Sequence, residues 1–551
     1  MELKFDYDEG KISQLIDHSL EAIHNCILEI EIEPQPTFAN TFDILEPLYQ
    51  QRQVVIGACE ILRRVAEKEV IRISALDACQ MAGQFDTQTY LRPTFYDRLM
   101  AATPSTPEQK HLQLEWKHRF QQYGTHLPEE ERKAICKLLN EHDALTQQYQ
   151  EVLQKDPAKC MIKIEELKGM SPDFILATEY KQRICRILPA HAQLVLKNCS
   201  VQKTCERVTA MLATRAEKNV KTFEKIQHKK AQISTLLGFK HHTALQLERA
   251  TLTREEIDQL LLHSVPPASP SQESVPAPEL ASHFPRDHVL QNVLKYVAEL
   301  TNVTIRSTTR PTWHKEVLVY EITDNLDKTG ARKGLFYIDV KEQEVDHPMA
   351  VRHIPMTEGP FPSGALLGAL PSQVAPHHIA NLYHECVFMV QQVLNSQPYW
   401  LISGLKPIPF DTANCLALVL EEWVYQHLSL LAKTPIPVKD LETYESHRKQ
   451  VQWKHIEKQT PIAQADLAIF SSVGLSSKEI IQLYTELVKQ PPNLGTWVDV
   501  SCYNTAARTY VAVFMSRFAA ALQPGVDFSK LLRSSVTRED WKRIPSLKGL
   551  I

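Results

Sequence analysis

Apolar side chains recur at intervals of three and four residues along most of the chain, a spacing that places them on one face of an α-helix. This periodicity predicts amphipathic helices over residues 11–31, 50–82, 129–154, 198–238 and 284–301. A further helix is expected to begin near Pro376, where proline suits the first helical turn. Its apolar stripe consists of Ile379, Leu382, Cys386, Val390 and Val393. The pattern therefore predicts a mainly α-helical protein.

Strand signals are confined to about residues 303–342. The β-branched and aromatic runs VTIRST, EVLVYEIT and GLFYIDV are typical of strands, and the polar run DNLDKTGARK separates the last two. From residue 374 the pattern is helical again, with proline-rich breaks at 398–409, 435–437 and 491–495. Residues 263–283 contain five prolines and several serines, so we expect a loop or linker there.

Charge and cysteine content exclude several classes of protein. Lys and Arg total 61 against 65 Asp and Glu, a formal charge of −4, so the chain lacks the basic surface expected of a nucleic-acid binder. The 11 cysteines are scattered without a Cys-x-x-Cys pair, which favours a reduced, intracellular protein over a zinc ribbon. The start lacks a secretory pattern, and no apolar run approaches the ~20 residues that cross a bilayer. We expect a cytoplasmic protein without a membrane span, and export by a route that needs no such signal stays open.

Several motifs follow one another in a recognisable order. They are PTFANTFDILEPL at 36–48, a segment beginning GTHLPEEERK at 124–153, LATRAEKN at 212–219, AQISTLLGFKHHTALQL at 231–247, WHKEVLVYEI at 313–322 and SGLKPIPFDTANCLALVLEEW at 403–423. In this order they resemble the thimet oligopeptidase and oligopeptidase A family of zinc metallopeptidases. The resemblance implies two helical lobes around a deep channel, with a small β-sheet beside the former active site. It also implies an N-terminal helical region at 1–195 and a metallopeptidase-like domain at 196–551, which contains the 263–283 loop.

The active-site helix of this family reads HEFGH, in which two histidines four residues apart bind zinc and the glutamate activates a water molecule. The same frame here is His384-Glu385-Cys386-Val387-Phe388. His384 therefore keeps the first ligand position and Glu385 the general-base position, whereas Phe388 replaces the second ligand. The third ligand is a glutamate in the family, and the corresponding residue here is Asn414.

The C-terminal substrate segment departs from the family as well. The family carries there a histidine, a glycine-rich loop and several tyrosines that donate hydrogen bonds near the scissile carbonyl. The corresponding positions hold Ser501, Ala506 and Val513, while Tyr510 matches a family tyrosine. By the resemblance, Tyr510 is a vestigial substrate contact and Glu385 a vestigial general base.

Catalytic zinc sites use three protein ligands and a water molecule, and His384 alone keeps its place. We therefore expect no zinc and no other cofactor. The predicted protein is a catalytically inactive member of the family, a monomer that binds a peptide or protein in its channel and does not bind nucleic acid. Two alternatives stay open, an active zinc-dependent oligopeptidase and a scaffold for a folded protein partner. A replacement ligand set of His384, Glu385 and Glu421 also stays open.

Overall fold

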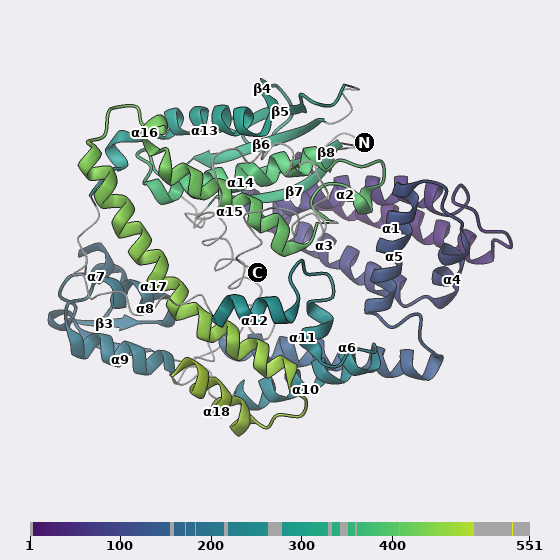
Figure 1. The fold of residues 1–551 in the computed structure, drawn as a ribbon, viewed down its shortest axis with the longest axis horizontal. Helices are drawn as coiled ribbons and strands as arrows, with labels where there is room; N and C mark the ends of the chain where they lie inside the picture. The colour runs from purple at the N-terminus through teal and green to yellow at the C-terminus, as the bar shows by residue number, and fades with distance from the viewer. Residues whose placement is uncertain are drawn as a thin grey trace.

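Helices make up most of the part of the chain that the structure describes, as the sequence predicts (Figure 1). The structure is a computed structural model. It describes residues 4–154, 159–170, 172–181, 183–213, 219–262, 278–328, 333–341, 351–358, 361–406, 408–489 and 532. No helix among these residues combines the length and the apolar character needed to cross a membrane. The expected cytoplasmic location and the domain boundary at residue 195 remain predictions.

Six helices form the first 154 residues. They are α1 (Glu9–Ile32), α2 (Phe42–Val65), α3 (Glu69–Tyr90), α4 (Pro93–Ala101), α5 (Pro107–Gln122) and α6 (Glu129–Gln154). The predicted helices at 11–31 and 129–154 are confirmed as α1 and α6. Asp8 begins α1 by accepting a hydrogen bond from the backbone N–H of Lys11 at 2.7 Å, which satisfies one of the free donors of the first turn.

The prediction of a single helix over 50–82 is wrong. The chain leaves α2 at residues 66–68, where Ala66 takes an extended backbone with ψ of 131°. The local sequence Ala-Glu-Lys consists of good helix formers, so nothing in it stops a helix. The break instead lets α2 and α3 pack side by side and bury Ala58, Ala75 and Ala78 in one core. Tertiary packing overrides the local preference here.

A small three-stranded sheet follows, which the sequence pattern did not predict. Its strands are β1 (Cys160–Lys163), β2 (Glu179–Lys181) and β3 (Ile184–Ile187), in the order β1-β3-β2. With three or four residues each, they are too short to show an alternating pattern. The helices around them and beyond are α7 (Pro172–Thr178), α8 (Pro189–Asn198), α9 (Gln202–Ala213), α10 (Val220–Leu236), α11 (His242–Gln246), α12 (Arg254–Leu262) and α13 (Arg286–Thr301).

Two more of the predicted helices can be compared with these bounds. The helix expected at 284–301 is confirmed as α13. The stretch 198–238 holds α9 and α10, and its first residues at 199–201 are not helical. Residues 263–277 of the expected linker lie outside the described residues, and its last residues, 281–283, form one turn of 3₁₀-helix.

The larger sheet lies beside the helix that carries the candidate site. Its strands are β4 (Val303–Thr308), β5 (Leu318–Asp324), β6 (Lys333–Lys341), β7 (Arg352–Glu358) and β8 (Phe361–Leu370). They are arranged in the order β4-β5-β6-β8-β7, with β6 and β8 parallel. The first three confirm the strands predicted within 303–342. The prediction that strands are confined to that range is wrong, since β7 and β8 lie beyond it. These two strands were missed because Pro355 lies within β7 and Pro362 and Gly364 lie near the start of β8, and such residues are typical of turns.

The remaining helices are α14 (Pro376–Leu394), α15 (Phe410–Gln426), α16 (Leu428–Leu431), α17 (Val438–Ser471) and α18 (Ser477–Val488). The helix predicted to begin near Pro376 is confirmed as α14, and the five residues of its apolar stripe are fully buried. Figure 1 shows α13, α14 and α15 along the larger sheet, while α17 extends from this region toward α18 and α10. The break predicted at 398–409 separates α14 from α15, and the break predicted at 435–437 separates α16 from α17.

Candidate functional site

Helix α14 positions the candidate site. Its buried stripe packs against the larger sheet and α15, which fixes the rotation of the helix about its axis. The residues His384, Glu385 and Phe388 therefore lie at its half-buried side, between β7 and α15. These three residues of the family frame thus lie together on one helix, and their predicted roles stay predictions.

His384 is held by a carboxylate on the neighbouring helix. Its Nδ1 lies 3.1 Å from Oε2 of Glu421 on α15, and the two side chains are 14% and 27% exposed. This contact joins α14 to α15 across the site. It also occupies one of the two ring nitrogens with which a histidine binds a metal.

Glu385 turns toward the sheet. Its Oε2 accepts a hydrogen bond of 2.7 Å from the backbone N–H of His353 on β7. Burial raises the pKa of the Glu385 carboxyl, while the His353 N–H and the neighbouring His384 act in the opposite direction. The predicted general base is thus a half-buried carboxyl tied to a strand backbone.

Phe388 fills the space one turn after His384. Its ring meets the His384 ring edge to face at a centroid distance of 5.0 Å and stacks on the His353 ring at 6.5 Å. Sequence reasoning missed His353, because a single histidine in a strand that contains a proline carries no recognisable pattern. Residue His353 keeps part of its surface exposed, but its Nε2 is buried without a hydrogen-bond partner among the described residues. Burial lowers the pKa of His353 to about 3, which keeps the ring neutral.

Other side chains of the site are apolar or aromatic in character. Cys386 is fully buried, and burial raises the pKa of its thiol, so it is a core residue rather than a nucleophile. Trp423 on α15 stacks on His427 with ring centroids 4.1 Å apart and on Tyr383 with centroids 5.8 Å apart. These contacts line up the two helices that carry His384 and Glu421.

The sequence profile of peptidase family M3 matches residues 267–518, a region that contains the site just described. This part of the chain belongs to peptidase family M3. The resemblance drawn from the sequence motifs is therefore confirmed at the level of the family.

Two known proteins align with the chain. A probable thimet oligopeptidase of Arabidopsis thaliana is 19% identical over 481 residues, which cover 76% of this chain and 67% of the plant protein. Oligopeptidase A of Haemophilus influenzae is 21% identical over 169 residues, or 28% of this chain and 24% of the bacterial protein.

Solved structures agree in fold. PZ peptidase A, solved with an inhibitor, superposes with a TM-score of 0.53 at 11% identity and covers 100% of this chain and 97% of its own. A putative peptidase from Chlamydophila abortus gives a TM-score of 0.55 at 8% identity and covers 100% and 95% of the two chains. At these identities the likeness shows that the chain has the mostly helical M3 fold.

An M3 peptidase needs a zinc site, so the described residues must be tested against that requirement. Catalytic zinc takes three protein ligands from nitrogen, sulfur or carboxylate donors. Within the described ranges, no group of three or more His, Cys, Asp or Glu side chains is placed to hold a metal ion. The replacement set of His384, Glu385 and Glu421 forms no such group among the described residues either, and Oε2 of Glu385 accepts the His353 backbone N–H instead. The described residues therefore do not fit the family's metal.

Some of the predicted site residues cannot be placed. Asn414 belongs to α15, but its side chain lies outside what the structure describes. The C-terminal positions Ser501, Ala506, Tyr510 and Val513 also lie outside the described residues. Their expected roles stay predictions of the sequence.

Proposed function

We propose that this chain is a catalytically inactive M3-type protein that keeps a channel for peptide or protein and binds its ligand without hydrolysing it. The observation that supports this most is the position of Phe388. Its ring lies against His384 where the family has its second metal ligand, 5.0 Å between ring centroids. An apolar ring offers no lone pair to a metal ion, so His384 has no second ligand at this position.

Loss of the metal removes the chemistry on which hydrolysis depends. A bound zinc ion lowers the pKa of its water from ~15.7 to about 7 and polarises the carbonyl that is attacked. Glu385 alone cannot generate comparable hydroxide at neutral pH. The family's tyrosine and histidine donors would each contribute about 3 kcal/mol to stabilising the transition state, and most of those positions are changed in the sequence.

Zinc content and peptide cleavage test this proposal together. The purified chain is dialysed against excess zinc and then against zinc-free buffer, and its metal is measured by mass spectrometry. We expect well under one zinc per chain and no cleavage of internally quenched fluorogenic peptides. One zinc per chain together with cleavage that a chelator abolishes would show that the alternative, an active zinc-dependent oligopeptidase, is correct.

Ligand binding is tested separately from catalysis. A labelled peptide of about ten residues should bind the chain in fluorescence anisotropy, remain intact in mass spectrometry, and be displaced by unlabelled peptide. A chain that binds no peptide, yet forms a complex with a folded protein that peptides do not disturb, would favour the scaffold. We expect the chain to act as a monomer, which light scattering checks.

A further inference from the structure

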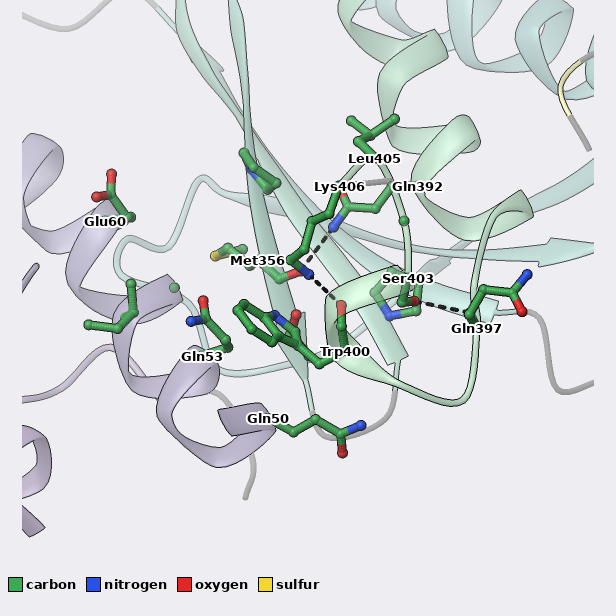
Figure 2. A pocket seen from close by; sticks show the side chains of 16 residues that line it. Gln50, Gln53, Glu60, Met356, Gln392, Gln397, Trp400, Ser403, Leu405 and Lys406 are labelled. Atoms are coloured by element: carbon green, nitrogen blue, oxygen red, sulfur yellow. Dashed lines mark hydrogen bonds between the residues drawn. The ribbon is translucent and has the colours of Figure 1, made fainter. Parts of the chain in front are cut away.

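A pocket of about 290 Å³ lies between α2 and the segment that follows α14 (Figure 2). One wall is the face of α2 that carries Gln50, Gln53 and Gly57, and the opposite wall is the segment 397–406. Residues 355–357 of β7 form its floor. Gly57 permits this approach of α2 to β7, because a Cβ there would lie 3.2 Å from Cβ of Met356.

Lys406 supplies the positive charge of this pocket. Figure 2 shows its side chain extending from the 397–406 segment, with Nζ donating a hydrogen bond of 3.1 Å to the Trp400 carbonyl oxygen. Nζ also lies 4.7 Å from the centre of the Trp400 ring. An ammonium has three donors, and among the described residues it has this one hydrogen-bond acceptor. Two donors are left for a ligand.

The Trp400 ring and the 397–406 segment, which surround the ammonium, are held in place by their neighbours. The Trp400 ring stacks on Tyr49 of α2, with centroids 5.7 Å apart and planes 16° apart. The segment itself is fixed by bonds from the Gln397 backbone N–H to the Ser403 hydroxyl at 3.1 Å and from the Gly404 N–H to the Asn395 carbonyl at 2.9 Å. Gly404 has a φ of +72°, which other residues adopt only at a cost. The pocket is therefore largely formed before a ligand arrives.

The ammonium forms no direct ion pair with a described carboxylate, although the buried Glu46 lies close enough to attract it. Glu46 instead accepts a hydrogen bond from the Trp116 indole N–H at 3.3 Å. The other ionisable lining residue, Glu60, is paired with Arg63 and Arg64. Desolvation and the nearby Arg119 lower the pKa of Lys406 to about 7, while Glu46 acts in the opposite direction. An anion at Nζ would favour the charged form.

The walls of the pocket define the rest of the ligand. Ile56, Met356 and Leu405 supply apolar surface, whereas Gln53 contributes an amide that has no hydrogen-bond partner among the described residues. The Trp400 indole N–H is a buried donor on the pocket lining that also lacks a described partner. A ligand with one carboxylate and a small apolar body matches this arrangement.

We infer that this pocket is a binding site for a carboxylate whose neighbouring group is apolar, with Lys406 holding the carboxylate and the α2 and β7 walls holding the apolar part. Two sources share this chemistry, the carboxyl terminus of a peptide and a free small acid. The pocket is separate from His384, because Gln392 follows it by eight residues, or about 12 Å along α14. The inference therefore holds whether or not the chain hydrolyses peptides.

Calorimetric titration of the full chain tests the inference with three probes. They are acetyl-Ala-Ala-Leu as the free acid, the same peptide as its C-terminal amide, and N-acetyl-leucine. The variants are Lys406→Met, which keeps length and removes charge, Lys406→Arg, which keeps charge, and Lys439→Met, a matched loss of an exposed lysine on α17. Circular dichroism checks that each variant is folded.

We expect the free acid to bind the unmodified chain at least tenfold more tightly than the amide, because a hydrogen bond to a charged group is lost in the amide. Lys406→Met should bind the acid as weakly as the amide, Lys406→Arg should keep most of the preference, and Lys439→Met should behave as the unmodified chain. Tight binding of N-acetyl-leucine would identify a free acid as the source, and much weaker binding would identify a peptide terminus. Equal affinity for acid and amide in the unmodified chain, or an unchanged preference in Lys406→Met, would overturn the inference.

Discussion

Gly364 of β8 leaves the space that the ring of His353 occupies beside the candidate site. Replacing Gly364 with alanine tests that packing directly. Gly364 lies opposite Pro355 on β7 and Phe336 on β6. A Cβ at this position would lie 2.4 Å from Nε2 of His353 and 3.0 Å from a ring carbon of Phe336. Carbon and nitrogen atoms do not approach to 2.4 Å without covalent bonding, so the His353 ring or the strand must move.

The cost of Gly364→Ala follows from this overlap. The His353 ring is confined between Phe336 and Phe388, with centroid distances of 6.3 and 6.5 Å, so it cannot swing away freely. Overpacking of this kind destabilises a core by about 1–3 kcal/mol. We expect a lower midpoint of equilibrium unfolding in urea. Gly83→Ala is the matched control, because nothing lies within 4 Å of its added Cβ on helix α3, and it should stabilise the chain by about 0.5–1 kcal/mol.

A double variant separates the overlap from other effects of the new methyl group. In a His353→Ala background the ring is absent, so Gly364→Ala should cost much less than in the unmodified chain. The same loss in both backgrounds would show that the overlap with His353 is not the cause. A Gly364→Ala protein as stable as the unmodified one would refute the packing argument altogether.

Three further predictions concern the metal site, a buried carboxyl and a buried ion pair. Phe388→His combined with Asn414→Glu should restore zinc binding, measured by mass spectrometry, but little peptide cleavage, since the C-terminal segment stays changed; rapid turnover would refute this. Burial raises the pKa of Glu46 from 4.5 to about 7, so the folded protein binds this proton more tightly than the unfolded chain does. Its destabilising effect is therefore absent below pH 4.5 and grows to roughly 3 kcal/mol above pH 7, and Glu46→Gln should remove that part of the pH dependence of unfolding. Asp86→Ala should lower the free energy of unfolding by roughly 2–3 kcal/mol, because it leaves Arg52, 1% exposed, without the carboxylate 2.6 Å away. The loss is smaller than for a fully buried pair because Asp86 itself is 26% exposed. Adding Arg52→Met to the same chain should recover much of this loss, measured by urea unfolding.

The sequence was most informative where one helix carries its own pattern. The buried stripe of α14 follows from the spacing of its apolar residues, and the resemblance to the M3 motif places His384 and Glu385 on it. The break between α2 and α3 could not be predicted, because residues 66–68 favour helix and the turn depends on packing between distant faces. Strand β7 was missed for a related reason, since Pro355 is tolerated only because β7 lies at the edge of the sheet.

The partners of the site were harder to predict than its helix. The sequence gives no sign that Glu385 bonds to the backbone of His353, because a main-chain donor leaves no trace in the residue types. The contact between His384 and Glu421 joins residues 37 apart in the chain, on two different helices, and no local pattern records that distance. The pocket at Lys406 depends on three separate segments meeting, which no local pattern records.

The contacts of Phe388 make the present state of the site hard to reverse by single mutations. Its ring touches His384 and His353 and packs against the large core around α14. A chain that regained histidine here would give up this packing at once, while a lone second ligand would still be too few to retain zinc. On the proposed function, this first step therefore lowers stability without restoring activity.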